Sequence, residues 1–199
     1  MQRDDRVMWF DALTGHVNRV IDTTPTQDGD VSKYVAAVSH DGSVVVTSGL
    51  TGVVTRMRRD GSVVWRVQEA LRCAYGVAIA YRWPPRDDEV DTVVVCEPFN
   101  YALQLFALDD GRHLGTIRDV YMYDVVFDPL ARVLVGFSGD VPSGEPGAGT
   151  RSGFVVCRLD GTRVATIDAL PKEPVHASIA FSPVDSAIAI ATRTKVTLL

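Results

Sequence analysis

The architecture of this chain follows from Leu103-Gln104-Leu105-Phe106-Ala107-Leu108-Asp109-Asp110-Gly111-Arg112-His113-Leu114-Gly115-Thr116-Ile117, in which an Asp-Gly turn stands between two apolar runs. Asp-Gly flanked by apolar runs is a strong short-range signal for a β-hairpin. Related turns occur at Phe10-Asp11-Ala12-Leu13-Thr14-Gly15, Arg59-Asp60-Gly61 and Leu159-Asp160-Gly161, and the last glycines of the four turns are 46, 50 and 50 residues apart. A repeat of this period, built only from short apolar runs, predicts the blades of a β-propeller.

A second hairpin precedes each Asp-Gly hairpin. In the first full repeat it consists of Val35–Val38, the turn Ser39-His40-Asp41-Gly42, and Val44–Val46. The same order recurs from Gly76, Asp124 and Ala177 onward. Two hairpins make a four-stranded antiparallel blade, and no helix longer than one turn is needed. We therefore expect an all-β fold.

The repeats divide the whole chain. We expect a single propeller domain, or a segment of one, over residues 1–199, with about four blades' worth of strands. The blades are predicted roughly at 1–21 (partial), 31–67, 75–117, 123–167 and 176–199 (partial). Because the first and last repeats are incomplete, three alternatives stay open: the chain is part of a longer ring, a second chain completes the ring, or one terminal strand is displaced.

Two inserts interrupt the period. Tyr81–Asp91 lengthens a turn in the second full blade, and Ser138–Gly153, rich in Gly, Pro and Ser, lengthens a turn in the third. Loops tolerate insertions at little cost, so we expect solvated loops here, with a binding loop at the rim as the alternative.

Composition indicates which kinds of partner and which cellular compartment to expect. Of the 199 residues, 46% are hydrophobic and 23% charged, and the formal net charge is -5. Nucleic acid is not an expected partner, because phosphate-binding surfaces gather Lys and Arg. Cys73, Cys96 and Cys157 lack a metal-binding spacing and lie in or beside apolar runs, so we expect buried thiols in a reducing compartment. Without a signal-type N-terminus or a membrane-length apolar run, the sequence predicts a cytoplasmic protein with no membrane contact.

One repeat carries a family pattern. Asn100-Tyr101-Ala102-Leu103-Gln104-Leu105-Phe106, followed by Asp110-Gly111, resembles the NHL repeat, Asn-x-Arg-Ile-Gln-x-Phe and then an Asp-Gly turn, with Ala102 where the family prefers Arg. Asp4–Phe10 and Lys195–Leu199 are weakly similar to parts of the same pattern. The resemblance implies a β-propeller. It also implies a choice between scaffolds that bind protein or RNA on one face and amidating-lyase-like or lactonase-like enzymes with metal in the central channel.

Four residues hold equivalent positions in the predicted blades. Tyr34, Tyr75, Tyr123 and His176 each come directly before the first strand of a blade. The first strand lines the channel of a propeller, so these side chains are expected to surround one mouth of it. Tyr and His offer flat apolar faces with polar tips, which suits the binding of a peptide or small ligand. The alternative is that each ring only fills the space between neighbouring blades.

Glu97 and Asn100 are expected near the same mouth, because the turns after the second strands open on that face. Carboxylate and amide oxygens are ligands that Ca²⁺ prefers, but the repeat pattern itself also accounts for Asn100 as a residue that holds a turn. No catalytic motif is present. We therefore expect a non-catalytic scaffold without a cofactor, which binds a protein or peptide. The alternative is a propeller enzyme with a divalent metal held by channel carboxylates and His176.

Overall fold

The computed structural model describes most of the chain. The exceptions are residues 1–5, 11–12, 23–33, 40, 49–51, 69–70, 82–89, 131, 143–149, 169–177, 183, 186, 192–195 and 199. Within the described part, the regular structure consists of strands and one 3₁₀ turn, η1 (Pro98–Asn100). No helix in that part has the length and apolar character that crossing a bilayer requires.

The strands form five separate antiparallel sheets. Three of these sheets have four strands each, in chain order: β3 (Tyr34–Val38), β4 (Val44–Ser48), β5 (Val54–Met57) and β6 (Val63–Val67); β7 (Val77–Ala80), β8 (Thr92–Glu97), β9 (Ala102–Ala107) and β10 (His113–Arg118); and β11 (Asp124–Asp128), β12 (Val133–Pro142), β13 (Thr150–Cys157) and β14 (Arg163–Asp168). A two-stranded sheet, β1 (Arg6–Phe10) and β2 (Val17–Asp22), precedes them, and a three-stranded sheet, β15 (Ser178–Phe181), β16 (Ile188–Ala191) and β17 (Val196–Leu198), follows.

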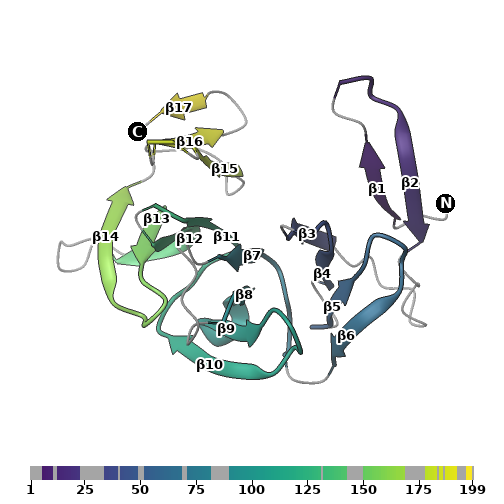
Figure 1. Ribbon diagram of the computed structural model, residues 1–199. Helices are drawn as coiled ribbons and strands as arrows, with labels where there is room; N and C mark the ends of the chain where they lie inside the picture. Colours follow the sequence, from purple (N-terminus) through teal and green to yellow (C-terminus); the bar gives the residue numbers. More distant parts are fainter. Residues whose placement is uncertain are drawn as a thin grey trace, which may run out of the picture.

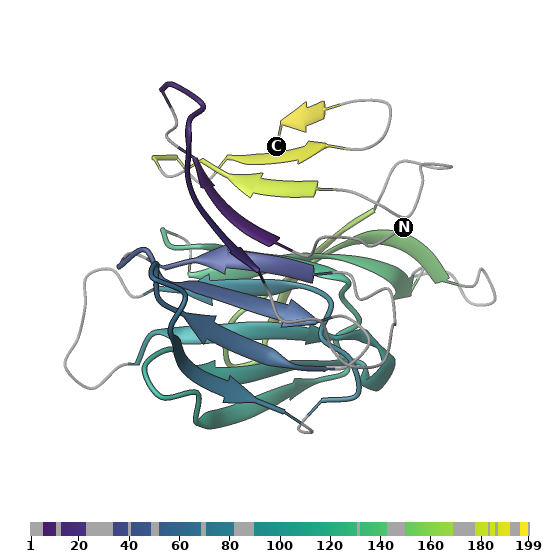
Figure 2. The ribbon, with the colours of Figure 1, turned by 90° about the vertical axis from the view of Figure 1, so that its right-hand side faces the viewer.

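The sheets are arranged radially. Their first strands contact one another in chain order, β3 with β7, β7 with β11, and β11 with β15. Figure 1 shows the sheets fanning around a common centre as an open arc, with β1–β2 and β15–β17 at its two ends. Seen from the side in Figure 2, the blue strands of β3–β6 lie in front of the teal strands of β7–β10. The predicted fold is confirmed: the chain is an all-β propeller of four-stranded antiparallel blades, and the described strands do not close its ring.

The core lies between the blades. The cluster between the β7–β10 and β11–β14 sheets contains Val94, Leu103, Met122 and Leu134, each with no exposed surface. Similar clusters join β3–β6 to β7–β10 and β11–β14 to β15–β17. All four residues of β7 are buried, which explains its small and medium side chains, Val, Ala, Ile and Ala. Cys73, Cys96 and Cys157 are buried free thiols, as their apolar surroundings predicted.

Glycine allows close packing at two places near the start of the third full blade, one between blades and one within that blade. A Cβ atom added to Gly76 would lie 2.8 Å from the Cα atom of Asp124 and 2.9 Å from the carbonyl oxygen of Tyr123. A Cβ atom on Gly136 would lie 2.6 Å from the carbonyl oxygen of Asp124 and 2.3 Å from the Sδ atom of Met122. The residue before β7 therefore packs against the start of the third full blade, and β12 packs against β11 and Met122 within that blade, more closely than any larger residue allows.

A buried arginine joins the first two full blades. Arg56 on β5 donates from Nη1 to the carbonyl oxygen of Leu108 at 2.8 Å, and the Nε1 atom of Trp65 donates to the same oxygen at 2.8 Å. The Nη2 atom of Arg56 lies 2.8 Å from the Oδ2 atom of Asp41, and its Nε atom donates to the Oγ atom of Ser43 at 3.0 Å. The Leu108 carbonyl thus belongs to the contact between blades.

The second insert differs in part from the expected loop. Strand β12 runs on to Pro142 and β13 begins at Thr150, with Val141 opposite Arg151 beyond a break in register after Ser138. Much of the Ser138–Gly153 insert therefore continues the hairpin, because the backbone groups of both arms pair with each other. The middle of this insert, and residues 82–89 of the other, lie outside the described residues.

Candidate functional site

Two of the predicted tyrosines occupy equivalent places in neighbouring blades. The backbone N–H of Tyr75 donates to the carbonyl oxygen of Cys96 at 3.0 Å, and that of Tyr123 donates to the carbonyl oxygen of Phe137 at 3.0 Å. Each bond continues the pairing of the first and second strands of its blade. Because β7 and β11 contact each other, the two tyrosines emerge side by side at the inner end of their sheets.

Five aromatic side chains meet at this end of the molecule. The ring centroid of Tyr75 lies 5.9 Å from that of Tyr123 and 5.8 Å from that of Phe99, in edge-to-face geometry. The centroid of Tyr121 lies 5.0 Å from that of Tyr123 and 4.9 Å from that of Tyr101. Such edge-to-face and tilted pairs are the favoured arrangements of aromatic rings. We call these five residues the aromatic surface.

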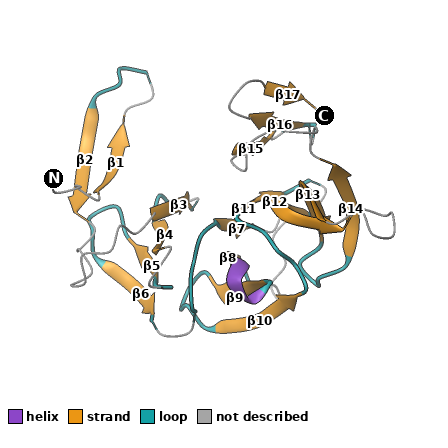
Figure 3. Ribbon diagram, turned by 180° about the vertical axis from the view of Figure 1, so that it is seen from behind, coloured by secondary structure: helices purple, strands orange, loops and turns teal. Residues whose placement is uncertain are grey.

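The η1 turn presents the most exposed rings of this surface. Figure 3 shows η1 as the purple turn next to β8. The turn ends at Tyr101, which has φ 52° and ψ 46°, donates its N–H to the Pro98 carbonyl at 3.0 Å, and accepts a bond from the Val120 N–H at 3.0 Å. This left-handed conformation is uncommon for a residue other than Gly or Asn. It leaves Phe99 59% and Tyr101 50% exposed.

A buried carboxylate holds the turn in place. Glu97 is 1% exposed at the end of β8. Its Oε1 atom accepts from the backbone N–H of Arg72 at 2.9 Å and from the Nδ2 atom of Asn100 at 2.7 Å. Its Oε2 atom accepts from the Nε2 atom of Gln104 at 2.7 Å. The Oε1 atom of Gln104 accepts in turn from the hydroxyl of Thr116 at 2.7 Å, so this network links three strands and two loops.

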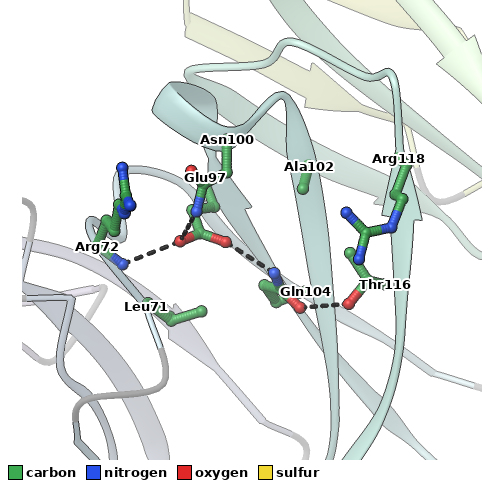
Figure 4. A pocket seen from close by; sticks show the side chains of 8 residues that line it. All are labelled: Leu71, Arg72, Glu97, Asn100, Ala102, Gln104, Thr116 and Arg118. Carbon is green, nitrogen blue, oxygen red and sulfur yellow. Dashed lines mark hydrogen bonds between the residues drawn. The ribbon is translucent and has the colours of Figure 1, made fainter.

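An open pocket of about 500 Å³ lies over this network. Figure 4 shows Glu97 and Gln104 at its centre, with Arg72 on one side and Arg118 on the other. Asn100 lines the pocket, whereas its chain neighbours Phe99 and Tyr101 belong to the aromatic surface. The pocket and the aromatic surface are therefore adjacent, with η1 between them.

The hydroxyl groups of the aromatic surface differ in their bonding. Those of Tyr121 and Tyr123 are hydrogen-bonded to each other. Within the described residues, the hydroxyls of Tyr75 and Tyr101 have no hydrogen-bond partner. Burial, followed by the proximity of Cys73 and Tyr123, raises the pKa of Tyr75 above its ordinary value. Tyr75 is therefore a neutral hydroxyl donor and acceptor at neutral pH.

The predicted site residues fall into three groups. The structure brings Tyr75 and Tyr123 together, and it places Glu97 and Asn100 in the hydrogen-bonded network beside them. Tyr34 is the first residue of β3, which contacts β7. His176 lies outside the described residues. A part in ligand binding for any of these residues remains a prediction.

Sequence reasoning missed Phe99, Tyr101 and Tyr121. The signal for the first two was their place on either side of Asn100, in a turn already expected to open on the same face as Tyr75. Tyr121 precedes Tyr123 by two residues, a spacing that puts both rings on one side of an extended segment. In the part of the chain that the structure describes, no group of three or more His, Cys, Asp or Glu side chains is arranged to hold a metal ion.

The sequence matches no protein-family model and no curated protein sequence. The fold is similar to a chain of hydrazine synthase from Kuenenia stuttgartiensis, with a TM-score of 0.67, 16% identity, and coverage of 94% of this chain and 49% of that chain. It is also similar to a chain of the nidogen/laminin complex, with a TM-score of 0.68, 12% identity, and coverage of 98% and 71%. The chain thus spans about half the length of the hydrazine synthase chain. At these identities the similarity shows the fold alone, and the fold is that of a β-propeller.

Proposed function

We propose that this chain is an NHL-like, non-catalytic β-propeller that binds a protein or peptide partner on the aromatic surface. The observation that carries the proposal is the exposure of Phe99 and Tyr101, 59% and 50%, within a cluster of five packed aromatic rings. Exposed aromatic clusters with polar tips are typical of protein-binding sites, because a ring buries a large apolar area while losing little conformational entropy.

The construction of the turn supports a binding role. Tyr101 keeps a left-handed backbone that costs about 1 kcal/mol for an ordinary residue. Glu97, buried and bonded to three donors, holds the adjoining residues rigid. A rigid surface loses less freedom on association, so its exposed rings bind a partner at lower cost. The hydroxyls of Tyr75 and Tyr101, which have no partner among the described residues, offer hydrogen bonds to the backbone of a bound peptide.

The family resemblance and one structural neighbour fit this reading. The pattern Asn100–Phe106 with Asp110-Gly111 resembles the NHL repeat, whose scaffold members bind partners on one face of the disc. One of the similar folds comes from a complex between nidogen and laminin. Tyr34 and His176 are proposed as further contacts of the partner, from their equivalent positions in the sequence repeats. A further chain that completes the open ring is a second proposed partner.

The test is a selection of peptides from a displayed random library on the immobilised chain, followed by affinity measurement of one selected peptide in solution. The double variant Phe99→Ser, Tyr101→Asn removes the exposed rings, and Asn tolerates the left-handed backbone of residue 101. We expect its affinity to fall at least about 30-fold, because each central aromatic residue of an interface commonly contributes 1 to 2 kcal/mol or more.

Val63→Thr is the matched control. Val63 is an exposed apolar residue, 55% accessible, on the outer strand β6, and Thr keeps its strand preference. The control variant should bind the peptide as the natural chain does. Selected peptides that bind the double variant as tightly as the natural chain would show that the aromatic surface is not the binding site.

A further inference from the structure

Two arginines line the pocket beside the aromatic surface. Among the described residues, the guanidinium groups of Arg72 and Arg118 have no hydrogen bond or ion pair, although both line this pocket. Both side chains are exposed. The chain as a whole carries a net charge of -5, so two cations at one pocket, without a partner among the described residues, differ in sign from the chain's overall charge. An unpaired pair of this kind attracts an anionic group.

The strand register sets the distance between the two arginines. Glu97 on β8 pairs with Ala102 on β9, and Ala102 pairs with Arg118 on β10, so the three residues form one row across the sheet. Strands lie about 4.8 Å apart, which places the backbone of Arg118 about 10 Å from that of Glu97. The Arg72 N–H is bonded to Glu97 on the other side. The small side chain of Ala102 leaves the middle of the row open, and Figure 4 shows the two arginines on either side of the opening.

The electrostatic balance of the pocket favours a single negative charge. Both oxygens of Glu97 accept hydrogen bonds, from the Arg72 N–H, Asn100 and Gln104, and among the described residues its carboxylate forms no ion pair with either guanidinium. Two arginines and one glutamate leave the lining with one positive charge. The planar fork of a guanidinium matches the two oxygens of a carboxylate, with two parallel N–H···O bonds. A monoanionic carboxylate balances this lining, whereas a phosphate dianion exceeds it.

We propose that this pocket binds a carboxylate group between Arg72 and Arg118, with Asn100 and Thr116 at its polar floor. The group belongs to an acidic side chain of a peptide or to a free carboxylate, such as a chain terminus or a small carboxylic acid. The proposal does not depend on partner binding at the aromatic surface, because a small carboxylate can occupy the pocket alone.

The experiment titrates the isotope-labelled chain with small probes at low salt and follows the backbone amide signals of Arg72, Thr116 and Arg118 by NMR. N-acetylglycine represents a free carboxylate, and N-acetylglutamic acid α-amide represents an acidic side chain. N-acetylglycine amide is the neutral control, and inorganic phosphate at about pH 8 is the dianionic one. We expect saturable shifts with one or both carboxylate probes and none with the neutral amide, and the tighter carboxylate identifies the source.

Two variants and a matched control complete the test. Arg72→Gln keeps the backbone N–H that bonds Glu97, and Arg118→Gln alters an exposed position, so both should remain folded. Each is expected to weaken carboxylate binding about tenfold, the loss of one charge-assisted pair. Arg66→Gln removes an exposed arginine on β6 and should change nothing. Equal weakening by Arg66→Gln, equal binding of the neutral amide, tighter binding of phosphate, or absence of binding would each overturn the proposal.

Discussion

The buried Glu97 is the residue whose replacement tests the construction of the site most sharply. The variant Glu97→Gln keeps the shape of the side chain and exchanges one acceptor oxygen for a donor NH₂ group. The amide oxygen can still accept from the Arg72 N–H and the Asn100 Nδ2 atom, which lie 2.9 and 2.7 Å from Oε1. The new NH₂ group then faces the Nε2 atom of Gln104, another donor, which lies 2.7 Å from Oε2.

Reversing the Gln104 amide moves this mismatch and does not remove it. Its Oε1 atom accepts from the Thr116 hydroxyl at 2.7 Å and lies 3.0 Å from the His113 ring nitrogen, so after reversal the Thr116 oxygen could accept from the Gln104 NH₂ group but the Thr116 O–H would lose its acceptor. In either orientation of Gln104 a donor is left without its acceptor, at a cost of about 2 kcal/mol. Hydrogen bonds to the neutral amide of the variant are weaker than those to the carboxylate, but this loss is offset because a neutral amide costs less to bury than a charge. We therefore expect Glu97→Gln to lower the free energy of unfolding by about 2 kcal/mol, or the melting temperature by about 4 to 8 °C.

Urea unfolding followed by circular dichroism measures this difference. Asp119→Asn is the matched control, because it makes the same carboxylate-to-amide change at an exposed position whose φ of 60° Asn tolerates. The control should remain within about 0.5 kcal/mol of the natural chain, as surface substitutions usually do. A Glu97→Gln variant as stable as Asp119→Asn would show that this network does not hold η1.

Three further outcomes are expected. Gly136→Ala should destabilise the fold by about 3 kcal/mol in urea unfolding, because its Cβ atom would lie 2.6 Å from a backbone oxygen, whereas Gly115→Ala, with nothing within 4 Å, should be neutral or slightly stabilising. The pKa of Asp41 is held below its ordinary value, first by the hydrogen bond from Ser39, then by those from Ser43, and also by the nearby charge of Arg56. Asp41→Asn should therefore lower the free energy of unfolding at pH 7. The difference in unfolding free energy between the variant and the natural chain should shrink as the pH falls below about 4, because the stability given by a lowered pKa is lost in acid. A difference that does not change with pH would contradict this expectation. Elemental analysis of the purified chain should show no stoichiometric divalent metal, and a bound Ca²⁺ or Zn²⁺ would favour the channel-enzyme alternative.

The repeat pattern was sufficient to predict the blades. Asp-Gly turns at a period near 50 residues, with β-branched runs between them, fix both the hairpins and their order, because local turn chemistry and the alternation of strands determine antiparallel pairing. The continued pairing beyond Ser138 was not predictable in this way. Gly, Pro and Ser in that insert indicate a loop, and only the second arm, in space, supplies the partners that make it a hairpin.

The site was predictable only in part, for a similar reason. Position before the first strand identified Tyr75 and Tyr123, which the structure places in contact. The exposure of Phe99 and the conformation of Tyr101 depend on a 3₁₀ turn that Glu97 holds through bonds to residues 25 positions before and 7 positions after it. Such contacts are not visible in a local pattern, and a buried glutamate surrounded by neutral donors resembles a surface residue in the sequence.

Hydrogen–deuterium exchange of the chain with and without a selected peptide tests the location of the binding site directly. We expect slower exchange on binding in η1 and the residues around it, 98–101, and in the segment 119–123 that carries Tyr121 and Tyr123. Exchange in the outer strands β6 and β14 should not change. Protection confined to those outer strands, with residues 98–101 unaffected, would contradict this prediction.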